Sequence, residues 1–191
     1  MVATQLTIDL EQCVTRRIVD SYSVHRLVYS LFPANTCGRI LFRDKGVRQQ
    51  ERTILIFSPV VPKGPSWVEL RTREVPDKLF TFSEYRFSVR MNPVFRRERK
   101  EFPIKGRLEQ GKWFLRKCGE WGFQVPQDQL IVSETDIQEI ASEKHHITQE
   151  SVVFSGVLEV TDRSRFRESV ENGIGRGKSF GFGLLEIIPI A

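Results

Sequence analysis

The chain has little of what several common protein classes depend on. It contains only three cysteines and three histidines among 191 residues. Cys13, Cys37 and Cys118 are odd in number and widely spaced, so they form neither a disulfide framework nor a zinc site, and we expect a reducing cytoplasm. No apolar run reaches the length of a membrane span, and the segment Met1–Gln5 has no signal-peptide pattern. We therefore expect no membrane partner.

The sequence also lacks the usual signatures of metal-dependent and triad-based enzymes. It shows no Ser-His-Asp pattern, no paired carboxylates and no clustered carboxylates suited to Mg²⁺. His145 and His146 are adjacent, but no cysteine or further histidine stands at metal-binding spacing, and we interpret their segment as a loop. We expect neither a metal nor a cofactor. If the chain is an enzyme, the simplest option is acid–base chemistry on RNA, whose 2′-hydroxyl supplies the nucleophile.

Basic residues are in moderate excess. The chain has 29 Lys and Arg against 24 Asp and Glu, a formal charge of +5, and a pI near 9.3. This balance favours a polyanionic partner, although a merely basic protein would have it too. The densest run lies at 96–100, which we interpret as an exposed loop and as a candidate phosphate track; its basic members are Arg96, Arg97, Arg99 and Lys100.

The most distinctive segment is a glycine-rich stretch near the C-terminus. It does not have the order of an ATP-binding loop, and we expect it to run into a strand over 180–188, where a nucleotide-binding loop would lead into a helix. Glycine lets another molecule approach the backbone closely, and cations among glycines favour phosphate. We therefore predict a backbone cradle for nucleic acid, formed by Gly173, Gly175, Arg176, Gly177, Lys178, Gly181 and Gly183.

Hydrophobic periodicity predicts an α+β protein with two similar halves. Each half shows a strand, a helix, two strands, a helix or irregular crossover, and a last strand, and we place the domains at 1–92 and 93–191. In the strand over 85–92, alternate residues form one core face and one cationic face. The expected strands are 4–9, 39–43, 53–57, 85–92, 130–132, 152–161 and 180–188; the expected helices are 20–32, 108–121 and a short one capped by Asp162.

The helix over 20–32 carries a candidate for proton transfer. His25 borders the apolar stripe of this helix without lying inside it, and Tyr22 and Tyr29 lie one turn away on the same side. Histidine can move a proton near neutral pH, and a neighbouring tyrosine hydroxyl could orient it or bind a phosphate oxygen. The alternative is a surface histidine beside an amphipathic tyrosine.

Four segments together resemble the CasE family of CRISPR precursor-RNA endoribonucleases, the processing subunits of Cascade-type complexes. They are Tyr22-Ser-Val-His25 with Leu31-Phe-Pro33; Phe87-Ser-Val-Arg-Met-Asn-Pro93; Trp113-Phe-Leu-Arg to Gly122-Phe123; and Phe154 to Asp162 with Gly173 to Leu185. The resemblance covers nearly the whole chain and is weakest over 58–79.

This resemblance implies two tandem ferredoxin-like, RRM-like domains. It implies metal-independent cleavage at the base of the repeat stem-loop by 2′-hydroxyl attack, with retention of the mature guide RNA. By position, His25 would transfer the proton, Tyr22 would assist it, and 173–183 would be the glycine-rich loop. The implied partners are RNA and other subunits of a Cascade-type complex.

Two other interpretations remain open at this stage. A non-catalytic subunit could hold a guide RNA without cutting it, but it would have no need for the Tyr22 and His25 pair. A basic protein–protein adaptor would leave the glycine-rich stretch poorly explained.

Overall fold

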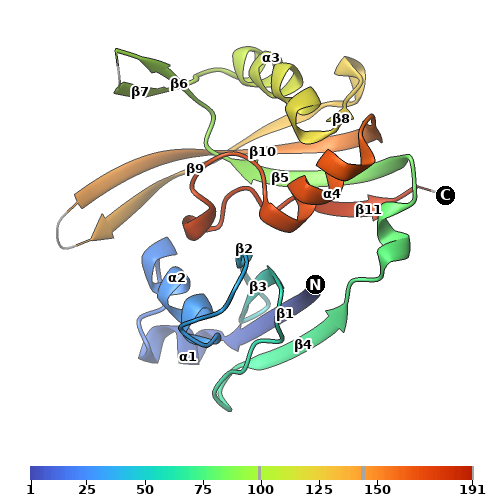
Figure 1. Ribbon diagram of the computed structural model, residues 1–191. Coiled ribbons are helices and arrows are strands. Elements are labelled where there is room, and N and C mark those ends of the chain that lie inside the picture. Colours follow the sequence, from blue (N-terminus) through green and yellow to red (C-terminus); the bar gives the residue numbers. More distant parts are fainter. Residues whose placement is uncertain (99, 143–144, 191) are drawn as a thin grey trace.

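The computed structural model describes residues 1–98, 100–142 and 145–190, and within this part the side chains of 134–150 are left undescribed. Two antiparallel sheets form the centres of two stacked units, drawn in blue to teal and in green to red in Figure 1. Each unit has the strand order of a ferredoxin-like fold, in which the first strand lies between the third and the fourth. The expected α+β architecture of two tandem ferredoxin-like domains is confirmed.

The first unit has its helices on one face of its sheet, whose order is β2-β3-β1-β4. Leu6 and Ile8 of β1 pack with Val24 and Val28 of α2 in one buried cluster, because alternate strand residues and every third or fourth helix residue are apolar. The elements are β1 (Val2–Asp9), α1 (Leu10–Thr15), α2 (Ser21–Ser30), β2 (Leu41–Arg48), β3 (Glu51–Ser58) and β4 (Glu69–Glu74).

The second unit repeats this plan with the order β11-β5-β10-β8, and β9 also pairs with β10. Phe114 of α3 stacks on Phe154 of β10 at 4.4 Å between ring centroids, and Phe166 of α4 packs on Tyr85 of β5 at 5.0 Å. The elements are β5 (Glu84–Met91), α3 (Arg107–Cys118), β8 (Phe123–Gln124), β9 (Ile131–Ser142), β10 (His145–Val160), α4 (Arg163–Asn172) and β11 (Glu186–Pro189).

A small two-stranded hairpin and four short 3₁₀ helices complete the described structure. The hairpin pairs β6 (Val94–Arg97) with β7 (Lys100–Pro103) and projects beside α3, at the upper left of Figure 1. The 3₁₀ helices are η1 (Asp77–Phe80), η2 (Gly119–Trp121), η3 (Gln127–Gln129) and η4 (Lys178–Phe180).

The strand pairing of the two sheets places the boundary between the units at an earlier residue than the sequence pattern indicated. β5 pairs with β10 and β11 in the second sheet, whereas the predicted division placed the strand over 85–92 at the end of the first domain. The fourth strand of the first sheet is β4, which lies within 58–79, where the resemblance is weakest and no strand was expected. We therefore propose that the domains divide within 75–83. The alternation of β5 was interpreted correctly, since Tyr85, Phe87, Val89 and Met91 are all buried.

Several local expectations differ from the structure. The strand expected over 39–43 continues to Arg48 with a bulge after Asp44, and the turn between β2 and β3 lies at Gln49 and Gln50, both at positive φ. Of the run at 96–100, Arg96, Arg97 and Lys100 belong to the paired strands of a hairpin and not to a simple loop. The backbone of His145 and His146 belongs to β10. The strand expected over 180–188 begins only at Glu186, because Phe180 closes η4 and Gly181 and Gly183 after it have positive φ.

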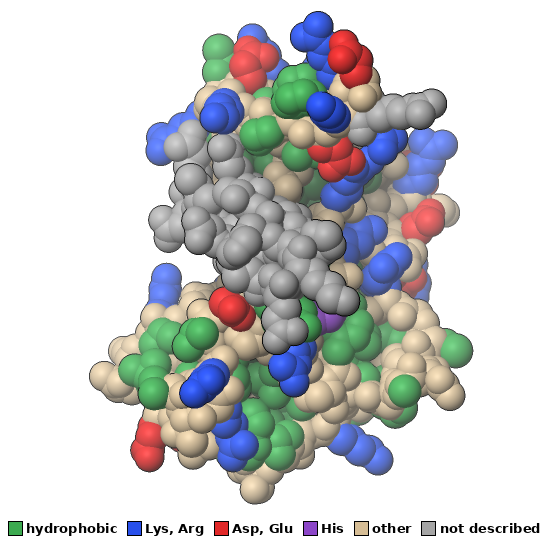
Figure 2. Space-filling model, turned by 90° about the vertical axis from the view of Figure 1, so that its left-hand side faces the viewer, with side chains coloured by type: hydrophobic (Ala, Val, Ile, Leu, Met, Phe, Trp, Pro, Cys, Tyr) green, Lys and Arg blue, Asp and Glu red, His purple; other side chains and the backbone are tan. Residues whose placement is uncertain are grey.

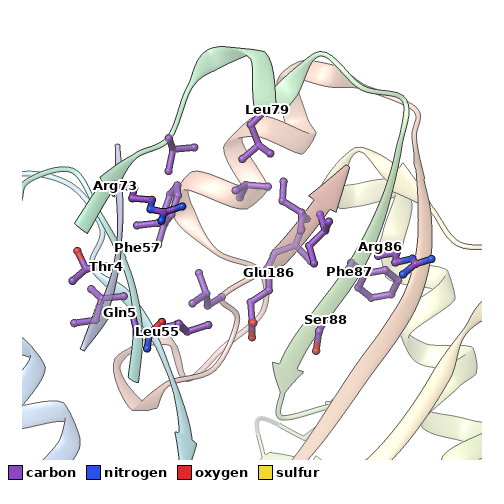
Figure 3. Close-up of a pocket in the computed structure, with 18 of the residues that line it drawn as sticks. Thr4, Gln5, Leu55, Phe57, Arg73, Leu79, Arg86, Phe87, Ser88 and Glu186 are labelled. Carbon is purple, nitrogen blue, oxygen red and sulfur yellow. The ribbon is translucent and has the colours of Figure 1, made fainter. Parts of the chain in front are cut away.

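The two units meet across a cleft and an ion-pair cluster. The cleft has a volume of about 700 Å³ and lies between the helix-free face of the first sheet and the strands β5 and β11 (Figure 3). Beside it, the guanidinium of the buried Arg43 is bonded to the carboxylate of Glu186 and donates to Ser88 Oγ at 2.9 Å. Lys45 Nζ also lies 2.7 Å from Glu186 Oε2. Side chains from β2, β5 and β11 therefore join the two units.

Candidate active site and nucleic-acid interface

The helix that carries His25 is fixed at its start and along its inner side. Asp20 caps α2: its Oδ1 accepts from the Ser23 N–H at 2.7 Å, and Ser23 Oγ accepts from the Asp20 N–H at 3.1 Å. This capping box satisfies backbone groups that a helix start leaves free. Val24 and Val28 are fully buried on the inner side. His25 is therefore held at the edge of a rigid helix, as its position beside the apolar stripe predicted.

The imidazole of His25 lies among aromatic rings from both units. Its centroid is 4.4 Å from that of Tyr29, 5.8 Å from that of Phe180 and 6.5 Å from that of Tyr22, whose ring is stacked with it. The Nδ1 atom lies 2.6 Å from the backbone oxygen of Ser179. The ring is partly exposed. The structure thus brings Tyr22 and His25 together, and it adds Tyr29, Ser179 and Phe180 to the site.

The glycine-rich loop reaches His25 because it folds back across the domain boundary. After α4 the chain pairs with itself through the Ile174 N–H, which donates to the Gly183 oxygen at 2.9 Å. The 3₁₀ turn of η4 then places Ser179 and Phe180 against α2. At Gly181, where φ is +84°, a Cβ atom would lie 3.1 Å from the Phe42 ring. At Gly183 it would lie 2.2 Å from the Ile174 oxygen.

Packing therefore accounts for these two glycines without any ligand. Both residues have positive φ, which L side chains rarely adopt, and both touch neighbouring protein atoms. The glycines of this loop led to the expectation that it cradles phosphate. Close packing within the protein is a second explanation for glycine at these two positions. What the loop demonstrably does is bring a backbone carbonyl and an aromatic ring to His25.

The two cations of the loop differ in their surroundings. Arg176 is exposed and forms an ion pair with Glu101 of β7, which links the loop to the hairpin. Lys178 is partly buried, and desolvation lowers the pKa of its ammonium, with a smaller contribution from the positive charge of Arg39. Lys178 and Arg39 thus place two positive charges close to the residue that contacts His25.

The β6–β7 hairpin presents basic and aromatic side chains to solvent. Arg96, Arg97 and Lys100 are exposed, and Phe95 and Phe102 stack at 5.5 Å although both are largely exposed. Arg99, also expected to contact RNA, lies outside the described residues. Lys and Arg side chains appear on both the upper and the lower part of the face in Figure 2, where grey atoms cover the centre.

Sequence reasoning missed Phe180 and Ser179 as parts of the site. The only signal was their position within the glycine-rich stretch, which identified a loop but not what it contacts.

The side chains of His145 and His146 lie outside the described part of the structure. Among the described residues, no group of three His, Cys, Asp or Glu could hold a metal ion. No described helix is both long and apolar enough to cross a membrane.

Comparison with known proteins identifies the family. A family profile described as "CRISPR associated protein" matches residues 1–189. The chain belongs to this family. Its relatives include the CRISPR-associated endoribonuclease Cse3 of Thermus thermophilus, 27% identical over 97% of this chain and 99% of the relative. The CRISPR system Cascade subunit CasE of Escherichia coli is 27% identical over 90% of this chain and 93% of the relative.

Solved structures of family members have the same fold. A structure of the endoribonuclease Cse3 bound to a 19-nucleotide RNA has a TM-score of 0.84 and 22% identity, covering 99% of this chain and all of that one. The CRISPR-associated protein Cas6e of Escherichia coli has a TM-score of 0.79 and 23% identity, with both chains covered completely. This likeness extends over both units, so the tandem arrangement is that of the family.

Proposed function

We propose that this protein is an endoribonuclease that cuts CRISPR precursor RNA at the base of each repeat stem-loop. It would act in the cytoplasm, as a subunit of a Cascade-type complex, and would keep the mature guide RNA bound. The single observation that carries the proposal is the position of His25 in a family that includes named endoribonucleases. Its partly exposed ring lies where both domains meet, next to a loop and a helix that carry cations.

The chemistry follows from what these side chains can do. The 2′-hydroxyl of the nucleotide before the cut attacks the adjacent phosphorus, and the P–O5′ bond breaks. The products are a 2′,3′-cyclic phosphate and a 5′-hydroxyl. His25 transfers the proton, Tyr22 assists it through its hydroxyl, and no metal is required for either step. Lys178 and Arg39 supply positive charge near the phosphate on which negative charge develops.

The RNA path would run from the hairpin to this site. Arg96, Arg97, Arg99 and Lys100 would contact the phosphates of the stem, and the stacked rings of Phe95 and Phe102 are exposed on the same hairpin. Arg176 and Lys178 continue the positive charge towards His25. The glycines at 173, 175, 177, 181 and 183 would shape the loop that carries these cations. Phosphate contacts of this kind fix the position of the RNA.

The test is single-turnover cleavage of a repeat RNA by His25→Ala and His25→Asn. We expect the cleavage rate of both variants to fall by a factor of about 10²–10⁴, the usual contribution of a general acid–base residue. RNA affinity should change only a few-fold, since most phosphate contacts would come from Lys and Arg side chains. Thermal unfolding of each variant is the control for folding. A variant that cuts at the wild-type rate would contradict the assignment.

Two substrate conditions test the rest of the mechanism. Cleavage should persist in EDTA, and RNA with a 2′-deoxy sugar before the scissile phosphate should bind but stay uncut. Loss of activity in EDTA would indicate a metal enzyme, and cutting of the deoxy substrate would exclude 2′-hydroxyl attack. Tight binding without any cleavage of normal RNA would instead support the non-catalytic interpretation.

Retention of the product follows from the extent of the basic surface. Contacts along a stem survive cleavage at its base, so the product keeps most of the binding free energy. With RNA in excess we expect one burst near one cut per protein molecule and a very slow phase after it. Many fast turnovers would show that the stem is released.

A further inference from the structure

The contact between His25 and the glycine-rich loop determines which nitrogen of the imidazole can react. The two atoms are His25 Nδ1 and the Ser179 oxygen, 2.6 Å apart. A carbonyl oxygen only accepts hydrogen bonds, so Nδ1 must carry the hydrogen and donate it. In the neutral ring the other nitrogen, Nε2, is then an acceptor with a free lone pair.

The loop is built to hold this carbonyl in place. Gly177 and Gly181 flank the turn in the left-handed conformation, and the Phe180 N–H donates to the Gly177 oxygen at 2.8 Å. The centroid of the His25 ring lies 5.8 Å from that of the Phe180 ring and 4.4 Å from that of the Tyr29 ring. These contacts restrict both the rotation and the tilt of the imidazole.

We propose that the loop 177–181 is a positioning element that fixes His25 as the Nδ1–H tautomer through the Ser179 carbonyl, so that Nε2 acts as the general base. The Nε2 lone pair takes the proton of the 2′-hydroxyl while the 2′-oxygen forms its bond to phosphorus. The P–O5′ bond breaks, its electron pair stays on O5′, and water protonates that oxygen, either directly or through the Tyr22 hydroxyl, which regains its proton from water. The imidazolium returns its proton to water.

This arrangement makes cleavage depend on both domains. His25 belongs to α2 of the first unit, whereas the carbonyl that orients it belongs to the second. Catalysis would therefore require the loop to be seated on α2, whereas binding of the stem by the hairpin would not. The inference rests on the proposed function, but the tautomer of His25 is a property of the free protein and is measured without RNA.

The direct test is ¹⁵N NMR of the protein labelled in its histidines. Only three histidines are present, and His25→Asn identifies the signals of His25 by their loss. At a pH where the ring is neutral, we expect Nδ1 to show the shift of a protonated nitrogen and Nε2 that of an unprotonated one. A predominant Nε2–H tautomer would overturn the inference.

The functional test disturbs the loop without touching His25. Gly181→Ala places a Cβ atom against Phe42 at a positive φ, and Gly46→Ala is the matched control, with φ of +77° but no atom within 4 Å of its Cβ. We expect Gly181→Ala to lower the single-turnover rate roughly 10- to 100-fold and to mix the His25 tautomers, with the Kd for repeat RNA changed much less than the rate, because the hairpin still holds the stem. Gly46→Ala should keep the wild-type rate and tautomer. Equal effects of both variants, or an unchanged tautomer in Gly181→Ala, would contradict the proposal.

A modified substrate distinguishes a general base from a general acid. RNA with sulfur in place of the bridging 5′-oxygen has a leaving group that needs no proton. If Nε2 is the base, His25→Asn stays inactive on this RNA, and its amide still donates to the Ser179 oxygen. Rescue of His25→Asn by the sulfur substrate would show that His25 is the acid. If the wild-type protein cut neither RNA, the proposed function would fail, whereas the tautomer would still be decided by NMR.

Discussion

At the scale of single residues, burial separates three cysteines that look alike in the sequence. Burial raises the pKa of the Cys118 thiol to about 12, and it also raises the pKa of Cys13, where the positive charge of Arg52 partly opposes the shift. Cys37 lies exposed in the segment between α2 and β2. The thiolate is the reactive form, so a raised pKa and burial both protect a thiol.

We therefore predict that a maleimide or iodoacetamide labels one thiol in the native protein. Near pH 8 the labelled residue should be Cys37, while Cys13 and Cys118 react only after unfolding. Mass spectrometry of the intact protein and of its peptides measures this. Rapid labelling of Cys118 under native conditions would show that α3 does not stay packed.

At the scale of elements, the cap of α2 matters because this helix carries the proposed catalytic pair. Asp20→Ala should destabilise the protein by about 1 kcal/mol, the typical cost of losing an N-cap acceptor. The first turn contains Tyr22, so cleavage should fall as well. Asp20→Asn is the matched control, since its amide oxygen can still accept from the Ser23 N–H. Denaturant unfolding and single-turnover kinetics check both effects, and equal loss in the two variants would contradict the capping role.

The cations of the glycine-rich loop should contribute to the salt dependence of RNA binding. Let K be the association constant for RNA. Replacing Arg176 and Lys178 together by Ala should make the negative slope of log K against log salt concentration shallower, by roughly one unit for each phosphate that the protein no longer neutralises. Arg71→Ala is the control, because it lies on β4, away from the hairpin in Figure 1, and pairs with Glu69. An unchanged slope in the double variant would mean that these cations face away from RNA.

Glu101→Gln offers a complementary change at the same place. Arg176 is paired with Glu101 when no RNA is bound. Removing the negative charge of Glu101 frees Arg176 to bind phosphate. It also removes the repulsion between Glu101 and the phosphates, so the affinity for RNA should rise modestly. Filter binding at several salt concentrations measures it, and weaker binding would show that Glu101 holds Arg176 in a favourable position.

At the scale of the whole molecule, an ion-pair cluster and a shared apolar core that includes Leu41 and Phe57 hold the two units in one arrangement. Glu186→Gln would leave the buried Arg43 with only a neutral partner, and we expect a loss of about 1–2 kcal/mol, since the pair is partly exposed. Glu69→Gln, which breaks the exposed pair with Arg71, should cost well under 1 kcal/mol. Thermal and denaturant unfolding compare the two variants. Because the loop reaches His25 from the second unit, Glu186→Gln should also slow cleavage more than it weakens RNA binding.

Much of the fold could be predicted from local patterns. The helix at α2, the helical stretch of α3 and η2, and the short helix after Asp162 all follow from apolar spacing and capping residues, which act over a few neighbouring positions. The alternation in β5 likewise predicted its buried face. None of these patterns states which strand pairs with which, and so the predicted division placed β5 in the first half, whereas it pairs with β10 and β11.

By itself, the sequence determined the three main helices, most strands of the two sheets, the basic character and the position of His25 beside an apolar stripe. Only the tertiary structure decided that Ser179 and Phe180, more than 150 residues further along the chain, lie against that histidine. It also showed that Gly181 and Gly183 are required by close packing within the protein. The physical reason is that periodicity and capping are local, whereas the partner of Nδ1 is set by strand order and by the packing of one domain on the other.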